Sequence, residues 1–321
     1  MATSRGPVWK VAGLAAGLAL GAPAAGAAER VVIPFEMNRS EHMIVELEIN
    51  GRTVTTGVVD TAATFAMVDA EAALRSGIAA PDGANRTIHI LGVNGVQVYP
   101  VVRLDTIVAG NLRLEAVDAA YNTASGVPGS AANVMPASAF PGDVLEFDFD
   151  AGTITAYDGK PDTVRTHFAD SVAYTVEGGL IFIEVRINGK PGRALIDTGS
   201  SLSYVNSAFA RVASMSRNEA LMHLLLGATG DSETAWIGSA RKVRLADFYV
   251  KGPNLLVSDP VLLDELRLSG QPVMVLGLDY LSNFRLQFDR RRQRLILGLP
   301  GDRGDVTLDL SADATRLPGG R

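Results

Sequence analysis

The chain has 321 residues, of which 29 are basic, 35 are acidic and 47% are hydrophobic. This apolar fraction can fill a core, which excludes a disordered chain, and the length predicts two domains of about 150 residues or one large domain. The formal net charge of -6 argues against a general nucleic-acid binder. Because there is no cysteine, disulfides, thiolate metal sites, a cysteine nucleophile and a lipoprotein anchor are excluded.

Residues 1–28 have the pattern of a secretory signal peptide. Arg5 and Lys10 give a basic start, residues 11–22 are apolar, and Ala25-Gly26-Ala27 is a small-x-small cleavage pattern. The apolar run is too short for a membrane span, which needs about 20 residues. We therefore expect cleavage near residue 28, export to the periplasm or beyond, and no membrane span in the mature chain.

The remainder of the chain contains an internal repeat. Residues 45–51 (VELEING) match residues 183–189 (IEVRING), and each copy alternates apolar and polar residues before an Asn-Gly pair. This pattern predicts a strand that enters a hairpin. A second strand then leads into DTAAT at 60–64 in the first copy and DTGSS at 197–201 in the second.

The copies continue to match after the Asp-Thr motifs. Asp69 and Asn206 are residue types that cap helices, so short helices are expected at 70–75 and 207–215. Further matches pair residues 102–104 with 243–245 and residues 145–148 with 286–289. The intervening β-runs and turns predict a mostly β fold. The expected domains are a signal peptide, a first lobe, a linker, a second lobe, and a C-terminal strand (306–310) with a tail, at 1–28, 29–158, 159–172, 173–298 and 299–321.

Two motifs of the second copy carry a family resemblance. Asp197-Thr198-Gly199-Ser200 follows an apolar strand, and Val275-Leu276-Gly277 follows later in the chain. Together they resemble the pepsin and retropepsin superfamily of aspartic peptidases, in which Leu276 and Gly277 belong to the second signature. The resemblance implies two homologous acid-protease-like β-barrel lobes related by a pseudo-twofold axis, and a short helix at 278–281.

The repeated aspartates suggest the chemistry. If the lobes pack about a twofold axis, Asp60 and Asp197 meet there, and two carboxylates at about 3 Å share one proton. One carboxylate would activate a water while the other donates a proton to the substrate carbonyl. Thr61 and Thr198 would brace the two loops. The Ser200 hydroxyl would donate to Asp197 and lower its pKa, which would leave the shared proton on Asp60.

The resemblance also implies two flaps that cover a bound peptide. Flap-like hairpins are expected around Gly92 and Gly95 in the first copy and around Gly227 and Gly230 in the second. Because both copies keep one, the chain resembles a fused retropepsin dimer more than a pepsin. The expected partner is a peptide or protein substrate. We expect no nucleic acid, cofactor or metal, and a monomer, with a homodimer as an alternative.

The first copy departs from the family pattern at two positions. Ala62 stands where the family has glycine, and Pro136 stands where the second signature has glycine. Pro136 also lacks an N–H donor. These departures leave two alternatives open: a protein that binds peptides without cutting them, or a homodimer whose second lobes pair through Asp197.

Overall fold

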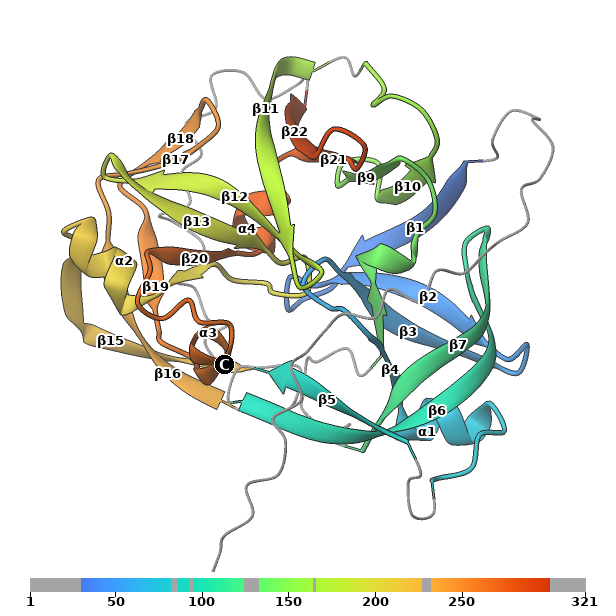
Figure 1. The fold of residues 1–321 in the computed structure, drawn as a ribbon. Coiled ribbons are helices and arrows are strands. Elements are labelled where there is room, and N and C mark those ends of the chain that lie inside the picture. The colour runs from blue at the N-terminus through green and yellow to red at the C-terminus, as the bar shows by residue number, and fades with distance from the viewer. Residues whose placement is uncertain are drawn as a thin grey trace, which may run out of the picture.

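The described part of the chain, taken from a computed structural model, forms two lobes of β-strands that lie side by side (Figure 1). The residues described are 30–81, 86–92, 95–123, 133–163, 166–226 and 232–300. The expected signal peptide and the expected strand at 306–310 lie outside these ranges. Among the described residues, no helix is long and apolar enough to cross a membrane.

The first lobe is built mostly from antiparallel strands and has two short helices in its described part. Its elements are β1 (Val31–Met37), β2 (Met43–Ile49), β3 (Thr53–Asp60), β4 (Ala66–Asp69), α1 (Ala70–Arg75), β5 (Thr87–Gly92), β6 (Gly95–Ala109), β7 (Leu112–Asn122), β8 (Val134–Pro136), the 3-10 helix η1 (Ala137–Ala139), β9 (Val144–Asp148) and β10 (Thr153–Tyr157). In β2, alternate residues from Met43 to Ile49 are buried, as the sequence alternation predicts.

The second lobe repeats this order and adds a helix. Its elements are β11 (Thr166–Glu177), β12 (Leu180–Ile187), β13 (Lys190–Ile196), β14 (Tyr204–Val205), α2 (Ser207–Val212), β15 (Ser216–Leu226), β16 (Ser232–Ser239), β17 (Lys242–Leu245), β18 (Phe248–Lys251), β19 (Asn254–Val257), α3 (Val261–Glu265), β20 (Val273–Leu276), α4 (Leu278–Leu281), β21 (Arg285–Asp289) and β22 (Arg294–Pro300). The predicted mostly β fold with two homologous lobes is therefore confirmed.

The helix caps follow the prediction in both lobes. The Asp69 carboxylate accepts from the Ala72 N–H at 3.2 Å, and the Asn206 side chain accepts from the Phe209 N–H at 2.9 Å. Each bond satisfies one of the free N–H groups of a first helical turn. The helix expected at 207–215 is shorter, because it ends at Val212 and Ser214 adopts a positive φ of 50°.

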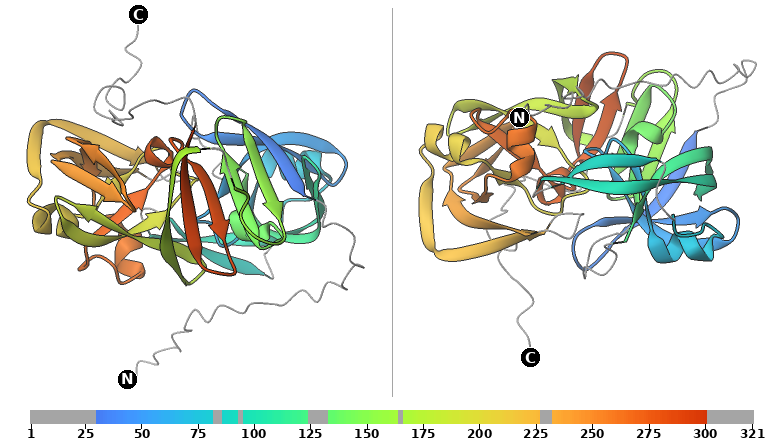
Figure 2. Two further views of the ribbon diagram at one scale, coloured as in Figure 1. Left: turned by 90° about the horizontal axis from the view of Figure 1, so that it is seen from above. Right: turned by 60° about the horizontal axis from the view of Figure 1, so that its bottom comes forward.

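A six-stranded antiparallel sheet joins the lobes, in the order β1-β10-β9-β21-β22-β11. Its two central strands come from different lobes, and they occupy the middle of the molecule in Figure 2. They are the repeated segments 145–148 and 286–289, with Glu146 opposite Gln287. Replacing each strand of this sheet by its equivalent in the other lobe gives the same strand order, read from the opposite edge. The pseudo-twofold axis therefore passes between the two central strands.

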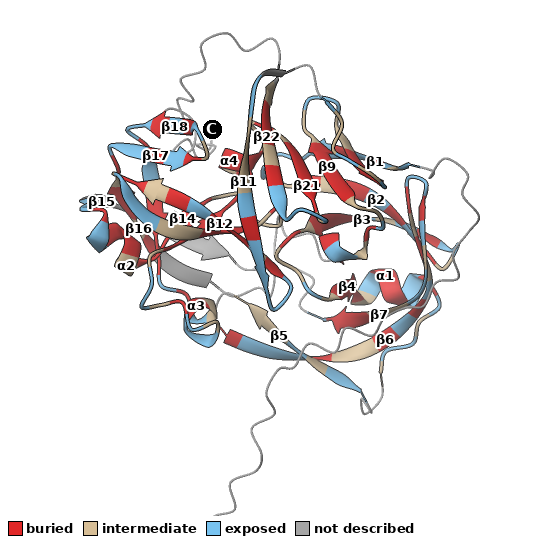
Figure 3. Ribbon diagram, turned by 45° about the horizontal axis from the view of Figure 1, so that its top comes forward, coloured by how far each residue is buried: buried red, intermediate tan, exposed pale blue. Residues whose placement is uncertain are grey.

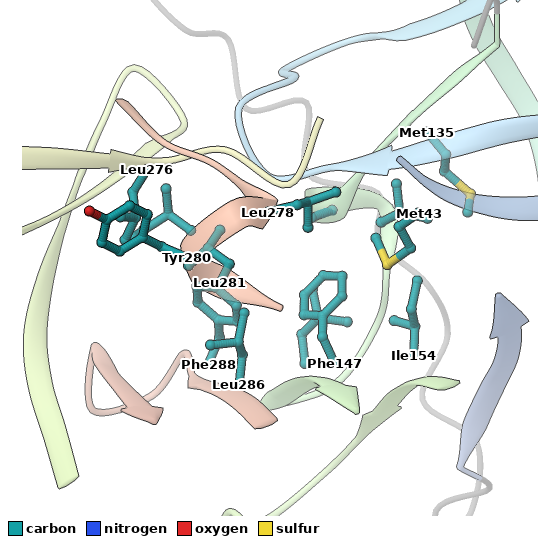
Figure 4. Packing of buried hydrophobic residues seen from close by; sticks show 14 of the residues in the cluster. Met43, Met135, Phe147, Ile154, Leu276, Leu278, Tyr280, Leu281, Leu286 and Phe288 are labelled. Carbon is teal, nitrogen blue, oxygen red and sulfur yellow. The ribbon is translucent and has the colours of Figure 1, made fainter. Parts of the chain in front are cut away.

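The two lobes share one core beneath this sheet. Phe147 and Phe288 meet edge to face with ring centroids 5.9 Å apart, and both side chains are buried (Figure 4). The buried carboxylate of Glu146 accepts from Gln287 Nε2 at 2.7 Å and from Arg285 at 2.6 Å. These polar contacts cross between the lobes and satisfy a charge that would otherwise be costly to bury.

In both Asn-Gly turns the asparagine side chain accepts hydrogen bonds from the backbone of a facing segment. These hydrogen bonds show that one of the matches expected between the two copies is wrong. Asn50 Oδ1 accepts from the N–H groups of Asp105 and Thr106 at 2.8 and 3.1 Å. Asn188 Oδ1 accepts from Arg241 and Lys242 at 2.8 and 3.1 Å. Lys242 therefore corresponds to Thr106.

It follows that residues 243–245 correspond to 107–109 and not to 102–104. The short Val-Arg-Leu string recurs by chance, whereas the turn hydrogen bonds fix the register. The strand β11 also occupies part of the segment expected as a linker, because it begins at Thr166 and pairs with β22. The lobe boundaries themselves stay a prediction.

Candidate active site

Asp60 and Asp197 stand at equivalent places in the two lobes. Each follows a buried strand that runs parallel to the strand of the second signature. In the first lobe Asp60 lies opposite Pro136, and in the second lobe Ile196 lies opposite Leu276. The Asp197 N–H donates to the Leu276 carbonyl at 3.0 Å. The backbone of each Asp loop is thus fixed to a strand that belongs to its own lobe.

The two threonines brace these loops across the lobes. Thr61 Oγ1 donates to the Ile196 carbonyl at 2.8 Å, and Thr198 Oγ1 donates to the Val59 carbonyl at 2.8 Å. Each oxygen also accepts the other threonine's N–H at 3.1 Å. The threonine side chains are buried, so this symmetric set of bonds is shielded from water.

The brace brings the two carboxyl groups together. Asp60 and Asp197 lie within hydrogen-bonding reach of each other. Asp60 Oδ1 accepts from the Ala62 N–H at 2.6 Å, and Asp197 Oδ1 accepts from Gly199 and Ser200 at 2.9 and 3.0 Å. A Cβ added to Gly199 would lie 2.5 Å from Asp60 Oδ2, so only glycine leaves room for the opposite carboxylate.

Burial raises the pKa of both carboxyl groups, and the Ser200 hydroxyl does not have the role expected from the sequence. Burial, followed by the negative charge of Asp60, holds the pKa of Asp197 well above its usual range. Burial also raises the pKa of Asp60, but the N–H groups of Ala62, Ala63 and Gly199 oppose that rise. The Ser200 hydroxyl donates to the Leu202 carbonyl at 2.8 Å and not to Asp197. The expected lowering of the Asp197 pKa by this hydroxyl is therefore wrong.

The second signature supports the Asp197 loop from behind. The N–H groups of Leu278 and Asp279 donate to the carbonyls of Ser200 and Ser201 at 2.8 and 3.1 Å. A Cβ on Gly277 would lie 2.8 Å from the Leu202 carbonyl carbon and 2.9 Å from the Ser200 carbonyl oxygen. Backbone atoms cannot move aside as a flexible side chain can, so this position requires glycine. The short helix expected at 278–281 is confirmed as α4.

Two side chains that support this loop were not predicted from the sequence. The Gly277 N–H donates to Ser203 Oγ at 2.8 Å, and Ser203 Oγ donates to Asp279 Oδ1 at 2.5 Å. Burial raises the pKa of Asp279 to about 6, against the hydrogen bonds from Ser203 and the Tyr280 N–H. In the sequence, these two residues could have been found as an acid close after the second signature and a serine shortly after the Asp-Thr-Gly motif.

The first lobe replaces both members of this contact. Pro136 occupies the position of Gly277, and Ala66 occupies the position of Ser203. Proline has no N–H to donate and alanine has no hydroxyl to accept, so no polar group is left unpaired. The methyl group of Ala62, the other departure, packs against the buried apolar cluster of the second lobe that contains Leu180 and Phe182.

Both predicted flaps correspond to hairpins. In the first lobe, β5 and β6 pair up to Gly92 opposite Gly95. In the second lobe, β15 and β16 form the hairpin, and Gly227 and Gly230 lie outside the described residues. The first hairpin approaches the other lobe, since a Cβ on Gly95 would lie 3.5 Å from Val261 Cγ1 in α3. Figure 1 shows β5 beside α3.

Comparisons with known proteins agree with this geometry. A family model described as aspartyl protease matches residues 45–135 and 183–280, one segment in each lobe. A segment of 126 residues is 27% identical to Protein DDI1 homolog 1 from Bos taurus. That segment covers 38% of this chain and 28% of the relative's length.

Proposed function

The chain belongs to the aspartyl protease family, and from that premise we propose that it is an aspartic endopeptidase that uses both lobes. In this proposal Asp60 and Asp197 form one catalytic dyad, and the substrate is a peptide or protein. The observation that carries the proposal is the reciprocal bonding of Thr61 and Thr198, because it fixes both Asp loops against each other within one chain.

The proposed mechanism follows from the two carboxyl environments. Asp60 is the ionised partner and takes a proton from a water held between the carboxyl groups. Asp197 carries the shared proton and donates it to the carbonyl oxygen of the scissile amide, while the water oxygen bonds to the carbonyl carbon. The tetrahedral diol then collapses as its proton passes through the dyad to the amide nitrogen. The amine and the carboxylic acid leave, and no covalent enzyme intermediate forms.

Two observations favour cleavage over peptide binding alone. The Pro136 and Ala66 pair removes the Gly277 and Ser203 contact without an unpaired group, so the first loop keeps its place by other means. The Ala62 methyl packs into an apolar cluster and does not displace Asp60 from its hydrogen bond to the Ala62 N–H. The brace within one chain likewise favours the monomer over a homodimer that pairs two second lobes.

The test is cleavage of a mixed peptide library by the purified protein from about pH 3 to pH 8, the range in which a shared-proton dyad titrates. Asp60→Asn and Asp197→Asn serve as paired variants. Loss of cleavage in both is expected. Loss only in Asp197→Asn would favour the second-lobe homodimer. A folded wild type that cuts no peptide at any pH would favour the peptide-binding alternative.

We also propose that the chain is exported and that its first 28 residues are removed. The proposal rests on the basic, apolar and small-residue regions of the N-terminus. N-terminal sequencing of the protein from separated cell fractions tests it. A mature N-terminus near Ala28 or Glu29 outside the cytoplasm is expected, and an intact Met1 in the cytoplasm would contradict it.

A further inference from the structure

The outer faces of the two lobes differ in charge at four equivalent positions, two of which carry opposite charges. In the second lobe the face is formed by Arg186 on β12, Lys242 and Arg244 on β17, and Lys251 on β18. We call these four residues the basic face. The strand registers assign the equivalent first-lobe residues, which in the same order are Glu48, Thr106, Val108 and Glu115.

The basic face brings like charges into direct opposition. Arg186 lies opposite Arg244 on neighbouring strands, and Lys242 lies opposite Lys251. Like charges at directly opposite positions of an antiparallel pair destabilise a sheet. The first lobe builds the same strands without such a pair at these positions, since Glu48 lies opposite Val108 and Thr106 opposite Glu115. The fold itself therefore does not require the opposed charges.

The local acids offset these charges only in part. Glu184 pairs with Arg186 at 2.8 Å and Asp247 pairs with Arg244 at 2.5 Å. Lys242 and Lys251 instead lie over the Tyr249 ring, with their Nζ atoms 4.0 and 5.7 Å from its centroid. An open groove of about 430 Å³ lies between Arg186, Gly189, Lys242 and Arg244. Three cations thus line one groove, and Lys251 and the exposed Tyr249 ring lie beside it on β18.

The position of the face in the sheet indicates the form of its ligand. Strand β18 pairs with β17 alone among the described strands, so its other edge is free of sheet partners there. Tyr249 and Lys251 are exposed, and β17 and β18 lie at the outer end of the lobe (Figure 3). An extended peptide laid along such an edge exchanges backbone hydrogen bonds and presents alternate side chains to one face.

We propose that the basic face is a docking site for an acidic, extended segment of a partner protein. Carboxylates of that segment would reach Lys251 on β18 and Lys242 and Arg244 on the neighbouring strand β17. A protein segment fits better than a nucleic acid or an anionic membrane, because the four equivalent first-lobe positions carry two acids and no base, and the whole chain has a net charge of -6. The site is separate from the Asp dyad, so the proposal does not depend on peptide cleavage.

The test is an anisotropy titration with a labelled short peptide of alternating glutamate and threonine. All proteins carry Asp60→Asn, so that cleavage of the probe cannot imitate dissociation. The double variant Lys242→Gln/Lys251→Gln should bind at least about 10-fold more weakly than its parent at low salt, and added salt should weaken peptide binding by the parent. The double variant Lys160→Gln/Arg211→Gln changes the same charge at exposed sites elsewhere and should bind as the parent does.

Three results would overturn the proposal. In the first, the parent binds the peptide no better than it binds the version with glutamine in place of glutamate. Both double variants bind like the parent, which would put the peptide elsewhere. Double-stranded DNA or phosphatidylglycerol vesicles bind more tightly than the peptide through the same two residues, which would assign the face to another class of partner. Thermal melts verify that both double variants are folded, and removal of opposed cations should not lower the melting temperature.

Discussion

In the second lobe the Gly277 N–H is bound by the Ser203 hydroxyl, whereas in the first lobe Pro136 and Ala66 occupy the same two positions. Replacement of either partner alone would bury an unpaired donor or acceptor, at a cost of about 1–3 kcal/mol. Replacement of both removes donor and acceptor together. The comparison teaches that a position which departs from a motif has to be judged together with its contact partner.

The two Asp loops also differ at the position where the family motif has its glycine. Gly199 faces the Asp60 carboxylate, and Ala62 packs against apolar side chains. One loop therefore supplies the space for the dyad, and the other loop contributes to the apolar packing between the lobes. Because of this division, equal substitutions in the two lobes should have unequal effects.

The largest difference is expected between Gly199→Ala and Ala62→Gly. The new methyl in Gly199→Ala would press on Asp60 Oδ2, and displacement of a catalytic group by about 1 Å can cost roughly 100-fold in rate. We expect kcat/KM to fall by at least about that factor, and Ala62→Gly to remain within several-fold of the wild type. Peptide cleavage assays on the two purified variants measure this, and equal losses would show that the loops are equivalent after all.

A second pair compares the two signature positions for stability. In Gly277→Ala the added Cβ meets backbone atoms of Leu202 and Ser200, so overpacking should lower the free energy of unfolding by about 1–3 kcal/mol. Pro136→Ala should also lower it by about 1–3 kcal/mol, because it adds a buried N–H group for which Ala66 provides no hydroxyl acceptor. Denaturant unfolding measures both. A Pro136→Ala variant as stable as the wild type would contradict the matched replacement in the first lobe.

The third prediction concerns pH, because the second lobe has the carboxyl group of Asp279 where the first lobe has Ser138. The pKa of Asp279 is raised to about 6, so its protonated form is favoured by folding. The corresponding stability is present below the unfolded pKa near 4 and is lost as the pH rises towards 6. In Asp279→Asn this loss should disappear.

The variant should therefore gain stability relative to the wild type between about pH 4 and pH 7, on the order of 1–3 kcal/mol. Melting curves across this range measure the change. Ser203→Ala is the control, because it removes the hydroxyl contact but leaves the carboxyl group to titrate. Parallel pH curves for the wild type and Asp279→Asn would show that Asp279 titrates normally.

The smallest effect is expected for Ser200→Ala. The Ser200 hydroxyl donates to the Leu202 carbonyl, so its loss should cost about 1 kcal/mol of stability or less. Its removal should leave the pH–rate profile of peptide cleavage unmoved. A shifted profile would mean that the hydroxyl turns to Asp197 when substrate binds.

Local pattern was sufficient for much of the fold and for the centre of the site. Some features depend only on neighbouring residues and can be recognised in the sequence. They are the strand alternation in β2, the caps at Asp69 and Asn206, and the repeated Asp-Thr motifs. The repeat also led to the expectation that the two aspartates would meet if the lobes packed about a twofold axis.

Register and distant contacts were decided by the tertiary structure alone. The match of 102–104 with 243–245 failed because the side chains of Asn50 and Asn188 select the facing strand residues. The basic face became visible only once that register was known. Asp279 and Ser203 share a hydrogen bond although they are 76 residues apart. The Ser200 hydroxyl donates to the nearby Leu202 carbonyl. Sequence patterns record periodicity along the chain, whereas these contacts depend on which groups compete for one hydrogen bond after the strands have packed.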